Sequence, residues 1–456
     1  MPLILPGNVG SATAASGFDV SNSCRFNRAD SADMTLSMSS GGSQTKFTKS
    51  FWVKRCTVGE QHYIYDNSGT TQIFFHFRDS DKIGLGIFNS GAYSTELIST
   101  QLFRDVSAWY HFVIAVDYTN GTQAHRARIY VNGTEITAFD TGTRPGNDST
   151  TFDTFNSDKT HYIGSNASSN HYLHGYLAEV VHIDNAQLAP DQFGEFDEDS
   201  GIWKPIDVSG LTFGTKGYYL DYKASGNLGN DANGGTDWTE NNFAATDQSI
   251  DTCTNNFCTM NPLIPTTNAT FSEGNCKLAI GGSSIQGAGI GTFGLTAGKW
   301  YWEVKLLADK DNHTHGVISE LTAELNANVT AIQNDVGVTS WINGDGGEVV
   351  VDGSATTADY GIMAENSIMG IALDIDNYNI SYYNNGSASV TDFNMSTTRG
   401  TIFPLIKMGI NCTAEVNFGG CSAFAVSSGN TDGNGFGNFE HAPPSGYFAI
   451  CSKNLA

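Results

Sequence analysis

The chain has 456 residues, which is too long for one hydrophobic core and suggests about three domains. Its 23 Lys and Arg residues stand against 47 Asp and Glu residues, so the net charge is -24 and the sequence pI is about 4.6. Such a surface repels phosphate backbones and anionic lipid headgroups, which excludes nucleic acid and peripheral membranes as expected partners. No run reaches the ~20 apolar residues of a membrane span, so we expect no membrane insertion.

The composition is typical of an all-β protein. The 51 glycines far outnumber the 10 prolines, and aromatic residues make up 11% of the chain. These residues favour short strands joined by tight turns, and in a sandwich each strand buries one face. We therefore predict an all-β fold built from two antiparallel β-sandwiches, with helix in less than a tenth of the chain.

Residues 1–20 are predicted to form an N-terminal arm, because they are small, apolar and rich in Gly, Ala and Ser. The first seven residues contain no basic segment and no long apolar core, so we do not expect a signal peptide. Nothing then directs the chain to an oxidising compartment. We expect the eight cysteines to be thiols, although Cys253 and Cys258 are close enough in sequence to form a bridge.

Residues 21–205 are predicted to form the first sandwich. Apolar side chains alternate along Tyr110–Val116, as a half-buried strand requires. Asn132-Gly133 follows an apolar strand and supplies the positive φ angles of a two-residue hairpin. The order of four segments resembles the concanavalin A-like and laminin-G-like jelly roll: AWYHFVIAVD at 108–117, YVNG at 130–133, YIG at 162–164 and GYLAEVVHID at 175–184. This resemblance implies a lectin-type fold.

Residues 206–267 are predicted to be a connector with one or two strands. Tyr218–Tyr222 is the clearest strand, and a loop rich in Gly, Asn and Asp follows it. Cys258–Leu263 is predicted to be an extended segment that leads into the second sandwich.

The second sandwich is predicted at residues 268–425. Four motifs in order resemble a SPRY domain: GKWYWEV at 298–304, GIALDIDN at 370–377, SYYNNG at 381–386 and VNFG at 416–419. One departure from that pattern is Ser319–Asp335, whose apolar spacing predicts an amphipathic helix. Residues 426–456 are predicted to be a C-terminal tail, with a final strand at Tyr447–Ile450 added to a sheet edge.

Carboxylate pairs would indicate catalysis, since glycan hydrolases also use the lectin jelly roll. Glycoside cleavage needs two carboxyls about 5–9.5 Å apart across the bond. The strand at 175–184 offers Glu179 and Asp184, which lie five positions apart and are therefore expected on opposite faces. The acidic residues of 195–199 are expected in a solvated loop. We predict no catalytic residues, and we expect that the protein is not an enzyme.

No metal and no cofactor are predicted. The histidines lack the paired cysteines or the helical His-x-x-x-His spacing of zinc sites. Asp66 and Asp117 lie near strand ends and could bind calcium as laminin-G-like domains do, but a role in turns is the simpler interpretation. The sequence contains no P-loop and no dinucleotide fingerprint.

Glycan binding is the function that loop aromatics suggest. Sugars present apolar faces ringed by hydroxyls, so an exposed aromatic beside an amide or hydroxyl group is a suitable partner. In the first sandwich Tyr93 and the loop residues Asn170, His171 and Tyr172 meet this description. In the second, Trp341 and Tyr360 are expected in loops that form the binding surface of SPRY domains. Packing inside a loop is the alternative for each.

Taken together, the opening residues 3–12 and the pairing of a lectin fold with a SPRY fold resemble virion proteins of tailed bacteriophages. The resemblance implies a structural protein on the surface of the tail or capsid, made in the cytoplasm of the host bacterium. Its implied partners are other virion proteins, further copies of itself and a host cell-surface glycan bound by weak, multivalent contacts. A capsid decoration protein without receptor binding and a polysaccharide-degrading enzyme are the alternatives.

Overall fold

The computed structural model describes residues 17–455 except 40–41, 70, 90, 147–154, 265–267, 283–285, 320–336, 345, 357 and 396–399. The described chain divides into two compact units, and the boundary in the sequence lies between Thr254 and Asn255. They are called the N-terminal unit and the C-terminal unit below. Strands account for 45% and helix for 5%, which confirms the prediction of an all-β fold. No helix among the described residues is long and apolar enough to cross a membrane.

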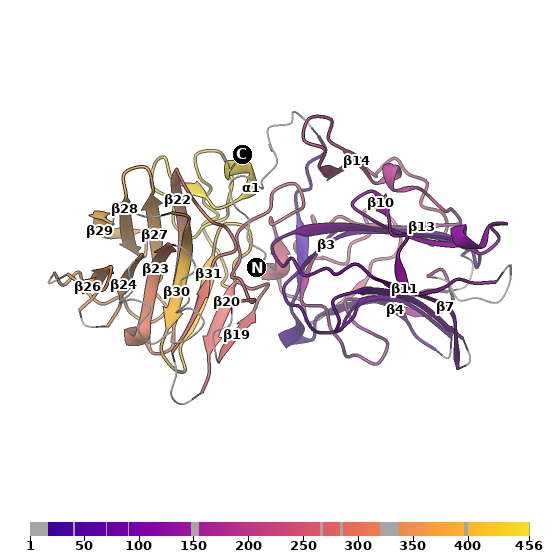
Figure 1. Cartoon of the computed structure of the whole chain (residues 1–456), viewed down its shortest axis with the longest axis horizontal. Helices are drawn as coiled ribbons and strands as arrows, with labels where there is room; N and C mark the ends of the chain where they lie inside the picture. Colours follow the sequence, from indigo (N-terminus) through magenta and orange to yellow (C-terminus); the bar gives the residue numbers. More distant parts are fainter. Residues whose placement is uncertain are drawn as a thin grey trace. The chain divides into compact units, whose positions relative to one another are not determined.

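The N-terminal unit contains two large antiparallel sheets that face each other across one core (Figure 1). Among its described residues the first sheet has the order β10-β9-β8-β3-β13-β1-β18, with β16 paired to β13. The bounds of its strands are β1 Ser23–Phe26, β3 Lys46–Arg55, β8 Trp109–Asp117, β9 Ala127–Val131, β10 Thr134–Glu135, β13 Gly175–Asp184, β16 Tyr218–Leu220 and β18 Gln248–Ser249.

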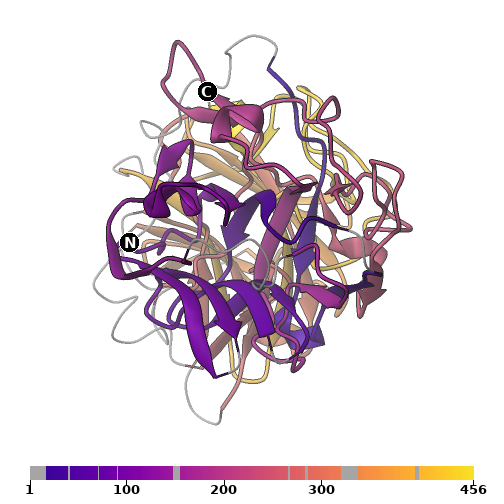
Figure 2. The same ribbon diagram turned by 90° about the vertical axis from the view of Figure 1, so that its right-hand side faces the viewer.

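The second sheet of this unit has the order β11-β7-β6-β5-β4-β12-β2-β17 in the described residues. Figure 2 shows strands of this unit, coloured indigo to magenta, side by side. The bounds are β2 Asp33–Ser37, β4 His62–Asn67, β5 Thr71–Phe77, β6 Ile83–Asn89, β7 Ala92–Ser99, β11 Phe139–Thr143, β12 Thr160–Ile163 and β17 Thr239–Asn241. A short hairpin is formed by β14 Gly194–Phe196 and β15 Trp203–Pro205.

Alternation along the strands fills the core between these sheets. Phe51 of β3 pairs with Phe112 of β8, and both side chains are fully buried with Phe75 of β5. The predicted hairpin at Asn132-Gly133 is confirmed, because both residues have positive φ angles of 46° and 76° and they join β9 to β10.

The opposite face of the first sheet is also buried, by the chain that follows β13. Val113 and Val181 pack there against Phe193 and Phe213. The ring of His111 stacks at 4.7 Å on Trp52. Its Nδ1 accepts a hydrogen bond of 2.9 Å from the indole N–H of Trp203, and its Nε2 lies 2.8 Å from the hydroxyl of Ser50. These contacts hold the β14–β15 hairpin on the sheet.

The predicted connector at residues 206–267 differs from the structure. Its first three strands belong to the N-terminal unit, where β16 pairs with β13, β17 with β2 and β18 with β1. Residues from Asn255 onward belong to the C-terminal unit. The reason is that β16, β17 and β18 have two or three residues each, which is too short for alternation to reveal a sheet partner.

The C-terminal unit is a second sandwich. In the described residues one sheet has the order β19-β20-β31-β22-β27-β28-β29, with β32 paired to β22, and the other has the order β21-β30-β23-β24-β25-β26. The bounds are β19 Ala269–Ser272, β20 Lys277–Ile280, β21 Gly287–Ile290, β22 Lys299–Leu307, β23 His313–Ser319, β24 Val338–Ile342, β25 Glu348–Val351, β26 Ser354–Ala355, β27 Ile368–Asp374, β28 Asn379–Asn384, β29 Ser387–Asn394, β30 Ile402–Met408, β31 Thr413–Asn417 and β32 Phe448–Ala449.

The central strand β22 is buried on both faces. Trp302 and Val304 point into the core, whereas Glu303 points away from it. The carboxylate of Glu303 accepts hydrogen bonds from the backbone N–H groups of Glu440 (3.0 Å) and His441 (2.7 Å). The predicted C-terminal tail is therefore a covering segment of this sheet, and its strand β32 pairs with β22 and not with an edge strand.

Helical structure is limited to short turns in the described residues. A short helical turn follows β13, with Pro190 at its start, where the missing N–H of proline costs no hydrogen bond. The helix predicted at 319–335 falls outside the described residues, apart from Ser319, which ends β23. The bounds are η1 Arg28–Asp30, η2 Gln123–His125, η3 Pro190–Gln192, η4 Ala245–Asp247, η5 Lys310–Asn312 and α1 Ser452–Leu455. All eight cysteines lie in the described residues, and none forms a disulfide.

Truncation tests the assignment of residues 206–254 to the N-terminal unit. A fragment of residues 17–254 should unfold cooperatively, whereas a fragment of residues 17–205 should not. The shorter fragment loses the partners of β1, β2 and β13 and exposes the apolar core that Leu220 and Trp238 complete. Circular dichroism during heating measures the difference. Equal melting temperatures for the two fragments would show that residues 206–254 are a connector and not part of the N-terminal unit.

Candidate functional site

Six aromatic side chains form a continuous strip on the second sheet of the N-terminal unit, on the face that points away from the core. The strip crosses β4, β5, β6 and the start of β7 and ends at the loop 167–173. Its members, called the aromatic strip below, are Tyr63, Phe74, His76, Phe88, Tyr93 and His171. Neighbouring ring centroids lie between 4.9 and 6.3 Å apart. These separations are those of favourable aromatic pairs.

The sequence of β5 places two of these rings. Ile73, Phe75 and Phe77 are fully buried in the core. Because side chains alternate along a strand, Phe74 and His76 point to the opposite face. The aromatic content of this strand is thus divided between the two faces of the sheet, although Phe74 and His76 are themselves only 8% and 3% exposed.

Glycines in the neighbouring strand β6 let these rings lie flat against the sheet. A Cβ atom at Gly86 would stand 2.2 Å from the ring of Phe74, and one at Gly84 would stand 2.4 Å from Nε2 of His76. Both positions pair directly with the strand that carries the rings. Any side chain at either glycine would lift the ring above it, so the flatness of the strip depends on β6.

Polar groups border the aromatic strip. Nε2 of Gln61 lies 2.8 Å from Nδ1 of His76. Burial raises the pKa of Tyr93, and two charged groups lie near it: the carboxylate of Glu96 raises that pKa further and the guanidinium of Arg78 lowers it. Burial lowers the pKa of His76 to about 3 and raises the pKa of Tyr63 to about 12. Both rings are therefore uncharged at neutral pH. The part of the strip that solvent reaches is Tyr93 and His171, together with the partly buried Tyr63 and Phe88.

The loop 167–173 is fixed at the end of the strip by a buried carboxylate. Asp66 accepts hydrogen bonds of 2.8 Å from the backbone N–H groups of Ala167 and Asn67. The backbone N–H of Tyr63 donates to the carbonyl of His171 at 3.0 Å. These bonds place the ring of His171 6.0 Å from that of Tyr63.

The structure places two of the predicted site residues, Tyr93 and His171, in the same aromatic strip. Tyr93 is 46% exposed and ends one side of the strip, and the exposed His171 ends the other. Asn170 is exposed and Tyr172 is partly buried beside His171 in the same loop. The four other strip residues, Tyr63, Phe74, His76 and Phe88, were not predicted. Their signal was the glycine alternation of β6, which marks a strand with one bare face.

The predicted placement of Trp341 in a loop is wrong. Trp341 lies within β24 and is fully buried among core residues, with its ring 5.4 Å from that of Tyr382. Its strand lies between β23 and β25, and the indole points into the core between the two sheets. Tyr360 does lie outside the strands, but it is partly buried and packs on Trp341 at 6.1 Å. The two residues form a packed pair.

Two of the carboxylates considered for catalysis, those of Glu179 and Asp197, are engaged in structural contacts. Glu179 stands at a bulge of β13 with a positive φ of 50°, is buried, and accepts a hydrogen bond of 2.6 Å from the hydroxyl of Tyr219. Burial raises its pKa to about 7. In the acidic loop 195–199, Asp197 accepts hydrogen bonds from the backbone and hydroxyl of Ser200, both at 2.9 Å. Each carboxylate thus supports its own segment.

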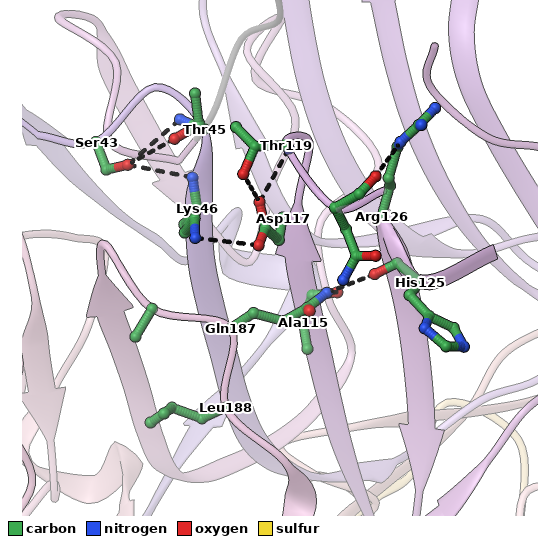
Figure 3. A network of polar contacts seen from close by, with 12 residues as sticks. Ser43, Thr45, Lys46, Ala115, Asp117, Thr119, His125, Arg126, Gln187 and Leu188 are labelled. Atoms are coloured by element: carbon green, nitrogen blue, oxygen red, sulfur yellow. Dashed lines mark hydrogen bonds and ion pairs between the residues drawn. The ribbon is translucent and has the colours of Figure 1, made fainter. Parts of the chain in front are cut away.

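The two aspartates considered for calcium hold loops in place. Asp66 binds the N–H groups described above. Figure 3 shows Asp117, which accepts the hydroxyl hydrogen of Thr119 at 2.6 Å and lies 3.1 Å from Nζ of Lys46. Within the described residues, no group of three His, Cys, Asp or Glu side chains is arranged to hold a metal ion.

A hollow of about 650 Å³ lies near this network and is lined by Ser43, Leu188, Leu211 and Thr215, together with Asp184. The carboxylate of Asp184 accepts the backbone N–H groups of Ser43 (2.7 Å) and Lys216 (3.2 Å). Because these two N–H groups occupy the carboxylate of Asp184, the hollow offers a ligand fewer binding groups than the aromatic strip does.

Both predicted domain types have matching families. Residues 28–191 match the concanavalin A-like lectin/glucanases superfamily, and residues 299–421 match the SPRY domain. No curated protein matches the chain.

Among solved structures, the SPRY domain of human HERC1 is 15% identical with a TM-score of 0.30, and the match covers 36% of this chain and 99% of that one. A Bacteroides ovatus protein described as carbohydrate-binding is 17% identical with a TM-score of 0.37. That match covers 49% of this chain and 59% of the Bacteroides chain.

The anchoring of the loop by Asp66 gives a pH dependence. Burial raises the pKa of Asp66 to about 7, against the effect of its two hydrogen bonds. Because the ordinary value is 3.8, the folded state binds more protons than the unfolded state between these pH values. The free energy of unfolding should therefore fall as pH rises from 4 to 7, by at most about 4 kcal/mol from this group.

Denaturant unfolding at each pH measures this slope. Asp66→Asn should flatten it, whereas Asp79→Asn, on an exposed turn, should leave it unchanged. An Asp66→Asn variant with the full wild-type slope would contradict the role of Asp66.

Proposed function

Since a concanavalin A-like domain and a SPRY domain make up this chain, we propose that it binds glycans through the aromatic strip and the loop 167–173. The observation that carries the proposal is the row of neighbouring rings on one face of the sheet, with Tyr93 and His171 exposed along it. The apolar faces of sugar rings stack on such aromatic surfaces, and their hydroxyls need partners at the border. Gln61 and Asn170 supply amide groups there, and Glu96 supplies a carboxylate.

The flatness of the strip predicts weak binding by one copy. A shallow surface buries few ligand atoms, and the sugar hydroxyls still have to lose water. Copies displayed together would raise the apparent affinity by ~10²–10⁴ through effective concentration. The negative net charge of -24 would reduce unspecific adhesion to anionic cell envelopes, so the strip would choose the partner.

Tyr93→Ala tests the glycan site with the smallest risk to folding, because this ring is 46% exposed. The variant should bind polysaccharide roughly 5–30-fold more weakly, since it loses a stacking contact of ~1–2 kcal/mol. Affinity electrophoresis through gels containing individual bacterial polysaccharides measures the change. Phe196→Ala is the matched control, because Phe196 is a 52% exposed ring of the same unit outside the strip.

Equal retardation of wild type, Tyr93→Ala and His171→Ala by every retained polysaccharide would reject the strip as the site. The same samples address catalysis. We propose that the protein is not an enzyme, because the carboxylates of Glu179 and Asp197 are engaged in structural contacts. Reducing ends released from a bound polysaccharide, and lost in Glu179→Gln, would overturn this.

At a finer level, we propose a structural protein on the tail or capsid surface of a tailed bacteriophage. The support is the resemblance of residues 3–12 and of the domain pairing to such virion proteins. The expected partners are other virion proteins and copies of this chain. A decoration protein without receptor binding is the alternative, and it differs in that the strip would bind no host glycan.

Immunogold electron microscopy distinguishes these locations. An antibody against the C-terminal unit should label purified phage particles at the tail or capsid surface. Labelling of host cell envelopes without labelling of particles would contradict the virion assignment. Labelled particles whose adsorption is unaffected by Tyr93→Ala would favour decoration.

A further inference from the structure

Three buried basic side chains gather at one end of the N-terminal sandwich. Arg55 ends β3, His62 begins β4 and His174 precedes β13. Arg55 and His62 are fully buried, and His174 is 5% exposed. The backbone brings the first and last together, because Gly175 pairs with Arg55 and the N–H of Cys56 donates to the carbonyl of His174 at 3.0 Å.

Much of the hydrogen-bonding capacity of this cluster is unused. Arg55 donates through Nη1 alone, to Asp81 at 3.2 Å and to the carbonyl of Phe103 at 2.5 Å. Its Nε and Nη2, both ring nitrogens of His62 and Nε2 of His174 are buried without a hydrogen-bond partner. Nε2 of His62 lies 3.6 Å from a carboxylate oxygen of Glu60, so Nδ1 is the ring nitrogen of His62 left for a ligand. Each unsatisfied buried polar group costs about 1–3 kcal/mol, so native proteins place a polar ligand or water at such points.

The charges of the cluster do not cancel. The carboxylate of Asp81 receives Arg55, Arg104 at 2.9 Å and the N–H of Gly59 at 2.7 Å, so two guanidinium groups share one carboxylate. Arg28 is paired with Glu60 nearby. Burial, with repulsion from Arg55, lowers the pKa of His62 to about 3, and burial lowers that of His174 to about 3. With neutral imidazoles, one positive charge remains in this group, shared between the buried Arg55 and Arg104, whose side chain is 59% exposed.

Geometry limits what can neutralise this charge. The ring of Phe77 covers the guanidinium of Arg55 at 4.5 Å. The carboxylate of Asp81 is taken up by Arg55, Arg104 and the N–H of Gly59, and that of Glu60 is paired with Arg28. A ligand there must be compact, singly charged and an acceptor of N–H groups.

We propose that Arg55, His62 and His174 form a buried site for a compact monovalent anion of the chloride class. The bound anion accepts hydrogen bonds from Nε and Nη2 of Arg55 and from an imidazole N–H. The site adjoins the strip residue Tyr63 through His62 and the loop 167–173 through His174. It stands independently of glycan binding.

Melting temperatures in different salts at constant ionic strength test the proposal. Replacing gluconate, which is too large for a buried site, by chloride or bromide should raise the melting temperature saturably by roughly 2–5 °C. Constant ionic strength is needed because salt also screens the large net charge. Arg55→Met and His62→Phe should abolish the rise, whereas Lys223→Ala, which removes an exposed cation, should retain it.

Equal melting temperatures in all three salts would overturn the proposal. If the variants fail to fold, wild-type crystals soaked in bromide decide between the outcomes. An anomalous peak in contact with Nε and Nη2 of Arg55, together with the salt-specific rise, supports the anion. Density without an anomalous signal means water, and a peak without the rise means binding at crystal concentration only. Both results overturn the site.

Discussion

The burial of both faces of β3 is the constraint on which the N-terminal unit depends. Nine of its ten residues are buried, and the strand alternates Phe51 and Val53 toward the core with Ser50 and Trp52 toward the other side. The second sheet covers only the core face of β3, so the buried polar groups on its other face need hydrogen-bond partners from elsewhere in the chain. The hydroxyl of Thr48 donates to the carbonyl of Ala186 at 2.8 Å.

The same demand explains why the chain returns over this sheet after β13. Ser50 is satisfied by His111, which in turn binds Trp203. Lys54 is satisfied by the buried carboxylate of Asp251 at 2.7 Å, which also accepts the indole N–H of Trp109. The covering segment therefore completes the fold, and the second sheet keeps one face open for the aromatic strip.

Sequence reasoning predicted the parts of the fold that have long, regular patterns. The strand at Trp109–Asp117 and the Asn132-Gly133 hairpin are confirmed because alternation and turn chemistry are local properties. The pairing of β17 with β2 and of β18 with β1 joins residues more than 200 positions apart, and that of β16 with β13 joins residues about 40 apart. No local pattern encodes such contacts. Trp341 shows the same limit, since the resemblance to SPRY domains implied a loop, whereas the residue lies within β24 and its side chain packs in the core.

Only two of the six residues of the aromatic strip were predicted from the sequence, for a related reason. Tyr93 and His171 stand in segments that look like exposed loops, whereas Phe74 and His76 occupy a strand whose other residues are core. Only the sheet register shows that these rings are neighbours. The alternation Ile83-Gly84-Leu85-Gly86-Ile87 was the available clue, because glycine in a strand indicates a close approach by another group.

The pairing of β1 with β18 has a consequence for synthesis of the protein. Ser23 pairs with Ser249, so the first and last strands of the unit are neighbours in one sheet. During translation, roughly ten to fifty seconds separate their appearance at the ribosome. Throughout that interval β1 and β2 lack their outer partners and present open hydrogen-bonding edges. Contacts between residues so far apart in the sequence also make folding slow. The nascent chain therefore depends on protection from aggregation until the residues that close the unit have emerged.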